Sequence, residues 1–450
     1  MPKEFRFRSM LMAVALAAAV FAGAPRAQVP QATDRAVPWV ATWGTAQLTF
    51  RAPPAPPAPP PPNAGPVLGP DPRRRHPIPP ALPGLKNQTV RMIVRSSIGG
   101  ETVRVRLAHA FGAPPVAIGA AHIAIREKDS AIVAGSDRAL TFGGRPTATL
   151  YGGQTLVSDP VTLAIKPLAD LAVSLYLPED TGPPTSHTFG LRPTYISKPG
   201  NVAADVAIAE PEKTTESWYW LAGIDVTAPA QRQGQAPVGT LVTFGDSITD
   251  GDQSTPDRIS MWPAFLAARL QANAATRNIG VVNAGISGNR LLGDNTSGLA
   301  RLTLHALSVP GVKWITLLEG INDISAATRP LPPGGGGGSH IPMTADDLIA
   351  AYKQVIASAH AQGVKVIGCT LTPYFGSRAY SDAGEEIRQA VNTWIRTSKA
   401  FDAVVDFDAA TRDPKQPNKL RPEADSPDDL HPGDPGYKMM ADAIPLTLFK

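Results

Sequence analysis

The sequence predicts two folded parts in one chain: an all-β sandwich, followed by an α/β part whose parallel sheet is covered on both faces by helices. Three observations support this prediction. The 450 residues are enough for two cores, because a domain usually has roughly 100 to 200 residues. Up to about residue 222, apolar and polar residues alternate in short runs. After residue 238, continuous apolar runs alternate with helical patterns.

The amino-terminal residues have the pattern of an export signal. Three basic residues within the first eight precede an apolar run from Met10 to about Ala24, and this order is typical of a secretory signal peptide. A membrane anchor is the alternative, but the run is shorter than the roughly 20 residues that span a bilayer. We therefore expect a signal peptide at residues 1–27, a secreted or periplasmic protein, and no integral membrane segment after its removal.

Charge and cysteine content argue against two classes of function. Residues 1–24 hold three basic residues and one acidic residue, so the formal net charge without them is +2 rather than +4. A balance this weak argues against nucleic acid as a partner. Cys369 is the only cysteine, so an internal disulfide is impossible and zinc–cysteine chemistry is not expected.

A proline-rich insertion at residues 52–84 interrupts the first part of the chain. Its composition argues against a helix or a central strand and predicts an extended, solvated segment. The run Arg73-Arg74-Arg75-His76 inside it could bind an acidic surface. We predict instead that it is a solvated run of charge.

A β-sandwich domain is predicted over residues 37–230. Apolar residues alternate over residues 90–94 and again over 103–107, with two glycines at 99–100 between them. This pattern predicts a β-hairpin with one buried face. The alternation recurs at residues 170–177, and short strands between Gly/Pro-rich turns are typical of a sandwich.

The α/β domain is predicted over residues 238–450. Its five apolar runs are typical of strands buried on both faces: "TLVTF", "IGVVNAG", "VKWITLLEG", "VKVIGCTLTP" and "AVVDFD". Between the third and fourth runs, a helical pattern follows Thr344 as its cap and stops at Gly363. The "PPGGGGGSHIP" stretch before it is expected to be a flexible loop. Strands that alternate with helices imply a parallel sheet, and active sites of such folds lie at the carboxyl ends of the strands.

Polar residues follow four of the five runs, at the edge where this fold has its site. In chain order they include Ser247, Gly288, Asn322, and Asp428 with His431. Nucleophilic catalysis needs an activated hydroxyl, a base, a group that orients the base, and donors for the oxyanion.

Ser247 can supply the hydroxyl and His431 the base. Asp428 can accept the Nδ1 proton of His431 and leave Nε2 free for Ser247. The backbone N–H groups of Ser247 and Gly288 and the side-chain amide of Asn322 are candidate oxyanion donors.

Each of these motifs alone also has a structural interpretation. Gly-Asp-Ser is often a turn, Asn322 could cap a helix, and Gly288 could serve turn geometry. Asp428 and His431 could form a surface ion pair or bind a metal, although no second histidine cluster accompanies them. Four clusters in order, each after a strand, favour the catalytic interpretation.

At these residues the chain resembles the SGNH hydrolases, also called the GDSL lipase/esterase family, over about residues 238–450. The matching blocks are "GDS" with Ser247, "NAGISGN" with Gly288, "GIND" with Asn322, and "DDLHP" with Asp428 and His431. The part that precedes residue 238 is similar to the β sandwich found before this domain in a group of secreted bacterial members.

The resemblance implies a flavodoxin-like three-layer α/β/α sandwich with a parallel five-stranded sheet. It also implies a Ser247/His431/Asp428 triad, an oxyanion hole made by Ser247, Gly288 and Asn322, and neither a metal nor an organic cofactor.

We therefore expect a secreted serine ester hydrolase that cleaves carboxylic esters through an acyl-enzyme on Ser247. Its substrate would be a small-molecule or polymer-borne ester. Two alternatives stay open: a carbohydrate O-acetylesterase that acts on acetylated polysaccharide, and a non-catalytic carbohydrate- or surface-binding protein on an esterase scaffold.

Overall fold

The computed structural model describes residues 39–47, 73–74, 79–227, 236–294, 296–328 and 343–449. The expected signal peptide, most of the proline-rich insertion and the glycine-rich loop lie outside these ranges. Val37–Lys450 forms one compact unit with two large hydrophobic cores. Within the described ranges, no helix combines the length and the apolar character that crossing a bilayer requires.

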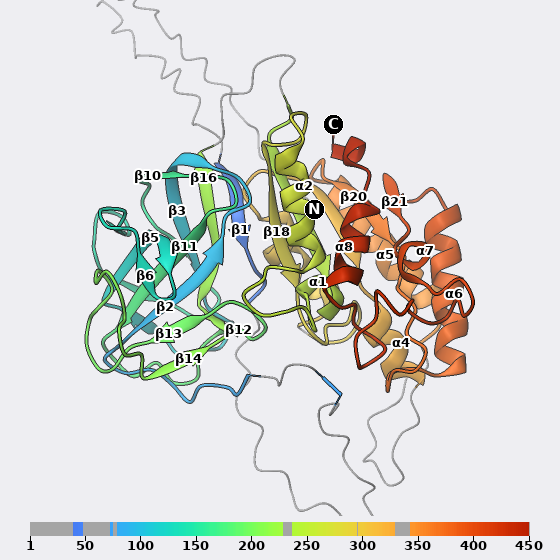
Figure 1. Cartoon of the computed structure of the whole chain (residues 1–450), viewed down its shortest axis with the longest axis horizontal. Coiled ribbons are helices and arrows are strands. Elements are labelled where there is room, and N and C mark those ends of the chain that lie inside the picture. Colours follow the sequence, from blue (N-terminus) through green and yellow to red (C-terminus); the bar gives the residue numbers. More distant parts are fainter. Residues whose placement is uncertain are drawn as a thin grey trace, which may run out of the picture. The chain divides into compact units, whose positions relative to one another are not determined.

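Residues 39–227, here called the β lobe, form two larger antiparallel sheets, drawn in blue to green in Figure 1. The first has the order β1-β16-β3-β10, with β9 also paired to β3: β1 Trp39–Gly44, β16 Leu221–Thr227, β3 Gly100–Ala108, β10 Val161–Ile165 and β9 Thr155–Val157. The second has the order β14-β13-β2-β11-β5-β6, with β7 paired to β5: β14 Lys213–Thr215, β13 Thr194–Ile196, β2 Gln88–Arg95, β11 Asp170–Leu177, β5 Ala120–Lys128, β6 Ala131–Ile132 and β7 Arg138–Ala139. Two short pairs complete the lobe: β12 Ser186–His187 with β15 Trp218–Tyr219, and β4 Val116–Ile118 with β8 Ala148–Leu150.

Side chains from both larger sheets meet in one core, which makes the β lobe a sandwich. Val105 of β3, Met92 of β2 and Val173 of β11 are fully buried members of this core. The predicted alternation of β11 is confirmed, because the four apolar residues at 171, 173, 175 and 177 all belong to it.

The prediction of a β-hairpin at residues 90–107 is wrong. β2 pairs with β11 and β13 in one sheet, whereas β3 pairs with β16 and β10 in the other. The two glycines therefore lie at a corner between the sheets. Arg91 shows why β2 suits a central position: it is buried, and its guanidinium donates to the Ser174 hydroxyl and to the backbone carbonyl oxygens of covering loops.

Residues 236–449, here called the α/β lobe, contain a five-stranded parallel sheet in the order β18-β17-β19-β20-β21, as the resemblance implied. The strands are β17 Gly239–Gly245, β18 Ile279–Gly285, β19 Val312–Leu318, β20 Lys365–Cys369 and β21 Ala403–Val405. Because both faces are covered, the strands are apolar throughout, and every residue of β17 is buried.

Helices cover both faces of this sheet and make the three-layer α/β/α sandwich (yellow to red in Figure 1). One group packs around α8: α2 Trp262–Ala272, α7 Phe407–Thr411 and α8 Asp434–Asp442. The other packs around α5 and α6: α3 Gly298–Leu302, α4 Ile321–Thr328, α5 Ala345–His360 and α6 Asp382–Thr397. Three short helices complete the lobe: α1 Ser247–Asp250, the π-helix η1 Thr303–Leu307 and the 3₁₀ helix η2 Leu446–Phe449.

The predicted helix after the glycine-rich stretch is confirmed. Thr344 caps α5 by accepting from the N–H of Asp347, whose side chain accepts in turn from the N–H of Thr344. The helix ends at His360, and Gly363 follows with a φ of +71°. This left-handed conformation is why a glycine stands there.

The β lobe covers the open edge of the parallel sheet. β18 is an edge strand, and such a strand has backbone groups without a partner in its own sheet. The N–H of Val281 donates to the hydroxyl of Ser97 (N–Oγ 2.8 Å), and the N–H of Ala41 donates to the hydroxyl of Thr240 (N–Oγ1 3.1 Å). Gly280 permits the close approach, since a Cβ there would lie 2.0 Å from the carbonyl oxygen of Ala41.

Two arginines of the proline-rich insertion also contact the α/β lobe, so the prediction of a solvated run of charge is wrong for them. Arg73 pairs with Asp429, and Arg74 pairs with Asp252. The side chain of Asp252 is only 3% exposed. A buried carboxylate needs such a partner, because its charge has lost most of its water.

The lobe contact leads to a stability prediction for Ser97→Ala. The change removes the acceptor of the buried Val281 N–H, so we expect the free energy of unfolding to fall by about 1 to 3 kcal/mol in urea denaturation. Ser358→Ala, at an exposed position of α5, is the matched control and should change it little. Equal stability of the two variants would contradict the role of this contact.

Candidate active site

Ser247 lies at the point where β17 passes into α1. Asp246 caps the helix, because its side chain accepts from the N–H of Ile248 (Oδ1–N 2.9 Å). A Cβ at Gly245 would lie 2.2 Å from Thr249 Oγ1 and 2.4 Å from the carbonyl oxygen of Leu318, so this tight turn requires a glycine. The sequence Gly-Asp-Ser thus holds one hydroxyl at the carboxyl end of a central strand.

The structure brings Ser247, His431 and Asp428 together, although 184 residues separate the serine from the histidine. Ser247 Oγ lies 2.8 Å from His431 Nε2, and Asp428 Oδ2 lies 2.7 Å from His431 Nδ1. Because an ionised carboxylate can only accept, Nδ1 carries a proton, and Nε2 of the neutral ring accepts from the serine. All three side chains are buried.

The aspartate is held by its own turn. Asp428 Oδ1 accepts from the backbone N–H groups of Leu430 and His431 and from the hydroxyl of Ser426. Burial raises the pKa of Asp428, but the hydrogen bonds from His431 outweigh it and hold that pKa well below its usual range. Burial lowers the pKa of His431, but the carboxylates of Asp252 and Asp428 outweigh it and raise that pKa above 6.5.

The three predicted oxyanion donors each have a proton available for this role. Gly288 has a φ of +76°, which favours glycine, and nothing lies within 4 Å of the position that a Cβ would occupy. Among the described residues, no acceptor takes a hydrogen bond from the N–H of Gly288 or of Ser247. The Asn322 amide donates one proton to the carbonyl oxygen of Asn289 (Nδ2–O 2.9 Å), and its second proton is available.

Residues 286–292, here called the oxyanion loop, are held by a buried arginine that the sequence analysis missed. Arg301 donates to the carbonyl oxygens of Gly245 and Ala284 and to the side chain of Asn289, at 2.8, 2.7 and 2.7 Å. Its guanidinium stacks on Phe244 at 3.9 Å from the ring centroid. One side chain therefore joins the ends of β17 and β18 to the oxyanion loop.

Asp323 holds the other end of the oxyanion loop. Its carboxylate accepts from the backbone N–H groups of Leu291 and Leu292, at 2.9 and 2.8 Å. Burial raises its pKa to about 6, despite these hydrogen bonds. Asn322 and Asp323 at the start of α4 thus both bond to the loop that carries Gly288.

The β lobe reaches the same loop through His187. Its Nε2 lies 2.9 Å from Asp250 Oδ1, its Nδ1 lies 2.7 Å from the carbonyl oxygen of Ala46, and its ring stacks on Trp218. Asp250 Oδ2 in turn accepts from both the N–H and the hydroxyl of Ser287, the residue before Gly288. A chain of hydrogen bonds therefore connects the β lobe to the candidate oxyanion donor.

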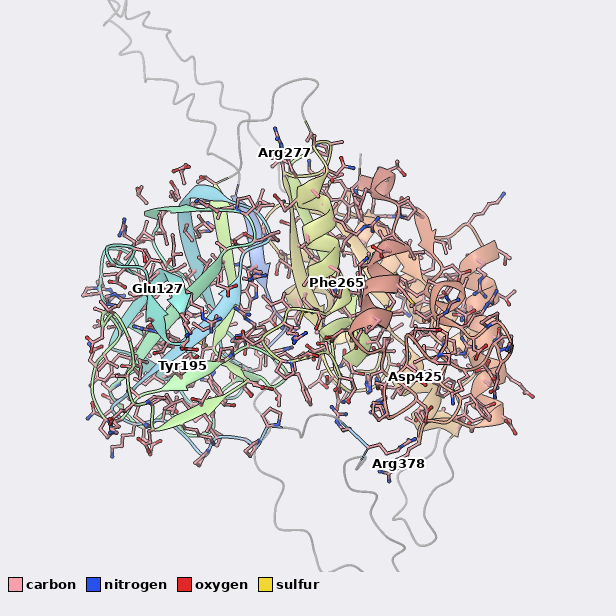
Figure 2. All side chains as sticks on the ribbon, viewed as in Figure 1. Glu127, Tyr195, Phe265, Arg277, Arg378 and Asp425 are labelled. Atoms are coloured by element: carbon pink, nitrogen blue, oxygen red, sulfur yellow. The ribbon has the colours of Figure 1, made fainter. Side chains whose placement is uncertain are left out.

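A cavity of about 310 Å³ lies beside this chain of hydrogen bonds, between the two lobes. Its largely apolar walls include Trp43, Phe189, Trp218 and Phe265, the last of which is labelled in Figure 2. Asp250 also lines it. In the part of the chain that the structure describes, no group of three or more His, Cys, Asp or Glu side chains could hold a metal ion.

Short sequence motifs predict the residues that come together around Ser247, but they do not predict the residues that hold them in place. Four such residues belong to no short motif, and each acts through a partner distant in sequence: Arg301, Asp250, His187 and Asp252. A histidine and an aspartate 63 residues apart carry no pattern that periodicity could detect.

Residues 243–439 match the model of the GDSL-like Lipase/Acylhydrolase family. No curated protein sequence matches the chain.

The chain is also similar to solved structures at low sequence identity, and three of them follow with their identity, TM-score and coverage. A GDSL-like lipase from Bacteroides thetaiotaomicron has 20% identity and a TM-score of 0.33, with 49% of this chain and 92% of that chain covered. An α/β hydrolase enzyme from the metagenome of Lake Arreo, Spain, has 19% identity and a TM-score of 0.36, with coverages of 46% and 94%. A catalytic mutant of an acetylxylan esterase from Geobacillus stearothermophilus has 22% identity and a TM-score of 0.35, with coverages of 46% and 93%.

The fold and the family match together define the class: the chain is a carboxylic ester hydrolase. More narrowly, it carries a domain of the GDSL-like lipase/acylhydrolase family at residues 243–439. The resemblance inferred from the four sequence blocks is thereby confirmed.

The raised pKa of His431 predicts the pH dependence of ester hydrolysis. A base must be neutral, so kcat/KM should fall as the pH drops through the pKa of the imidazole, and this pKa lies above 6.5. We expect the midpoint of the acid limb to lie above pH 6.5 in initial-rate measurements on an uncharged ester. A midpoint below 6.5 would contradict the assignment of the two carboxylates as partners of His431.

The connection through Asp250 predicts a catalytic effect of Asp250→Ala. The change removes the acceptor of Ser287, so the Gly288 N–H should move away from the oxyanion, and a displacement of about 1 Å costs about 100-fold. We expect kcat on p-nitrophenyl acetate to fall about 100-fold. Asp442→Ala, which removes a half-exposed carboxylate from α8, is the control. The connection is wrong if both variants keep the same kcat.

Proposed function

We propose that the chain is a serine esterase that cleaves carboxylic esters through an acyl-enzyme on Ser247. This proposal rests on one observation: buried hydrogen bonds link Ser247 Oγ to His431 and His431 to Asp428. These three residues can serve as the nucleophile, the base and the group that orients the base, which acyl transfer by a serine requires. The family match over the same residues supports it.

The first half-reaction forms the acyl-enzyme. Ser247 Oγ attacks the carbonyl carbon of the ester while Nε2 of His431 takes its proton, which makes a tetrahedral oxyanion and an imidazolium. Asp428 stabilises the imidazolium through Nδ1. His431 then gives the proton to the leaving alkoxide oxygen, the C–O bond breaks, and the alcohol departs.

The second half-reaction repeats these steps with water. His431 takes a proton from the water as its oxygen attacks the acyl carbon, and later returns the proton to Ser247 Oγ as the carboxylic acid departs. In both halves the N–H groups of Ser247 and Gly288 and the free proton of the Asn322 amide would donate to the oxyanion. Donors that are already in place act strongly in a buried site, because no water must reorganise.

We also propose that the protein is exported. The basic residues and apolar run at the amino terminus support this proposal. The substrate would then be an ester met outside the cytoplasm, either a small molecule or a group on a polymer. The same chemistry applies to a short-chain carboxylic ester and to the O-acetyl group of a polysaccharide, so a substrate comparison distinguishes them.

Ser247→Ala tests the proposed function most simply. Loss of the nucleophile should lower kcat on a p-nitrophenyl acyl series by at least about 1,000-fold, because acyl-enzyme formation becomes impossible. Ser358→Ala on the exposed face of α5 is the control and should retain the wild-type kcat. Acetylated polysaccharide, assayed in parallel by acetate release, distinguishes the O-acetylesterase alternative from general ester hydrolysis.

Two results would overturn the proposal. Full activity of Ser247→Ala would show that another group is the nucleophile. A wild-type protein that hydrolyses neither the acyl series nor acetylated polysaccharide would favour the non-catalytic binding protein.

A further inference from the structure

The two arginines of the proline-rich insertion contact the loops that carry the triad. The Arg74 NH2 group lies 2.6 and 2.5 Å from the two carboxylate oxygens of Asp252, and its guanidinium lies over Phe189 at 5.3 Å from the ring centroid. The side chain of Arg74 is 15% exposed. Arg73 bonds to Asp429 (NH1–Oδ2 2.8 Å), in the turn between Asp428 and His431.

Asp252 lies at the reacting nitrogen of the candidate base. Its Oδ2 is 3.7 Å from Nε2 of His431, which also accepts from Ser247. The position of Asp252 is held by its backbone, since its N–H donates to the carbonyl oxygen of Ser247 and its own carbonyl oxygen accepts from the hydroxyl of Tyr437. The backbone of Asp252 is therefore fixed next to Ser247, whereas its carboxylate, which is only 3% exposed, is held by side-chain donors.

A carboxylate at this place could compete with the serine for His431. Once Nε2 is protonated, the proton can be shared with Asp252 Oδ2 as an ion pair instead of passing to the leaving group. Arg74 contacts both oxygens of Asp252, and Gln253 donates to Oδ1 as well (Nε2–Oδ1 2.9 Å). With these donors in place, both oxygens of Asp252 already accept hydrogen bonds, and Oδ2 stays 3.7 Å from Nε2 of His431.

We propose that Arg74 is a positioning residue for ester hydrolysis: by binding Asp252 it holds that carboxylate off Nε2 of His431 and leaves this nitrogen to Ser247. The inference rests on the proposed roles of Ser247 and His431. If so, a residue of the proline-rich insertion affects ester hydrolysis in the α/β lobe. The composition of the insertion does not indicate such a role.

The charges around His431 give the direction of the expected effect. The charged groups that act on the imidazole come from several elements: Asp428 in its own turn, Asp246 and Asp252 on either side of α1, and Arg74. Arg74 is the cation of this set, and it opposes the effect of Asp252 on the pKa of His431. Its removal should favour the imidazolium and raise that pKa.

The test is the pH profile of kcat/KM for Arg74→Gln in the full chain. We expect the midpoint of the acid limb to move up by about one pH unit, with about a tenfold loss of kcat/KM below the midpoint and a nearly unchanged plateau at high pH. Adding Asp252→Asn removes the competing charge and should return the midpoint to the wild-type value or below it. Arg277→Gln, which removes an equal charge from the turn between α2 and β18 (Figure 2), should leave the profile unchanged.

Other outcomes overturn the inference. An unchanged midpoint of the acid limb in Arg74→Gln would contradict it. A loss of activity that is equal at every pH, and that adding Asp252→Asn fails to reverse, would also contradict it, because such a loss would be a structural effect. The ¹⁵N chemical shift of the His431 imidazole, titrated in the same variants, gives a second readout that needs no turnover. If Ser247→Ala retains activity, the assignment of the nucleophile is wrong. The His431 titration in Arg74→Gln would still show whether Arg74 affects the pKa of His431, because this measurement needs no turnover.

Discussion

The geometry of the site depends most on the hydrogen bonds that the buried guanidinium of Arg301 donates. It donates to the carbonyl oxygens that end β17 and β18 and to Asn289 of the oxyanion loop. Both oxygens lie at the carboxyl ends of two adjacent strands, and that of Gly245 also accepts from the backbone N–H of Ile286. Burying a charge is costly, but three hydrogen bonds and the ring of Phe244 offset that cost. One rigid, planar group therefore joins the strand before Ser247 to the oxyanion loop, which Asp250 and Asp323 hold at its two ends.

The β lobe takes part in the same arrangement. The hydroxyl of Ser97 binds the edge strand β18. The buried His187 bonds to Asp250, which accepts from the residue before Gly288. Burial lowers the pKa of His187, but Asp250 outweighs it and raises that pKa above its usual value. The β lobe therefore contacts both the edge of the parallel sheet and, through His187 and Asp250, the oxyanion loop.

Local patterns predicted much of the fold and the members of the candidate site. The helical pattern between Thr344 and Gly363 predicted α5, and the continuous apolar runs predicted the strands of the parallel sheet. The hairpin failed because a glycine pair marks a corner between two sheets as readily as a tight turn. Arg301 could not be predicted, because it acts on partners distant in sequence and a single arginine in a short helix has no periodicity. The basic run that contains Arg74 was noticed, but its partner Asp252 lies 178 residues away and no pattern identifies it.

The central claim is that Ser247 is a nucleophile activated by a neutral His431. Reaction with a fluorophosphonate tests it directly: Oγ attacks phosphorus, fluoride leaves, and the adduct persists on the residue that reacted. Peptide mapping by mass spectrometry should place the adduct on Ser247, and the labelling rate should fall at low pH as the imidazole becomes protonated. An adduct on another residue, or a rate on Ser247 that does not depend on the protonation of His431, would contradict the account.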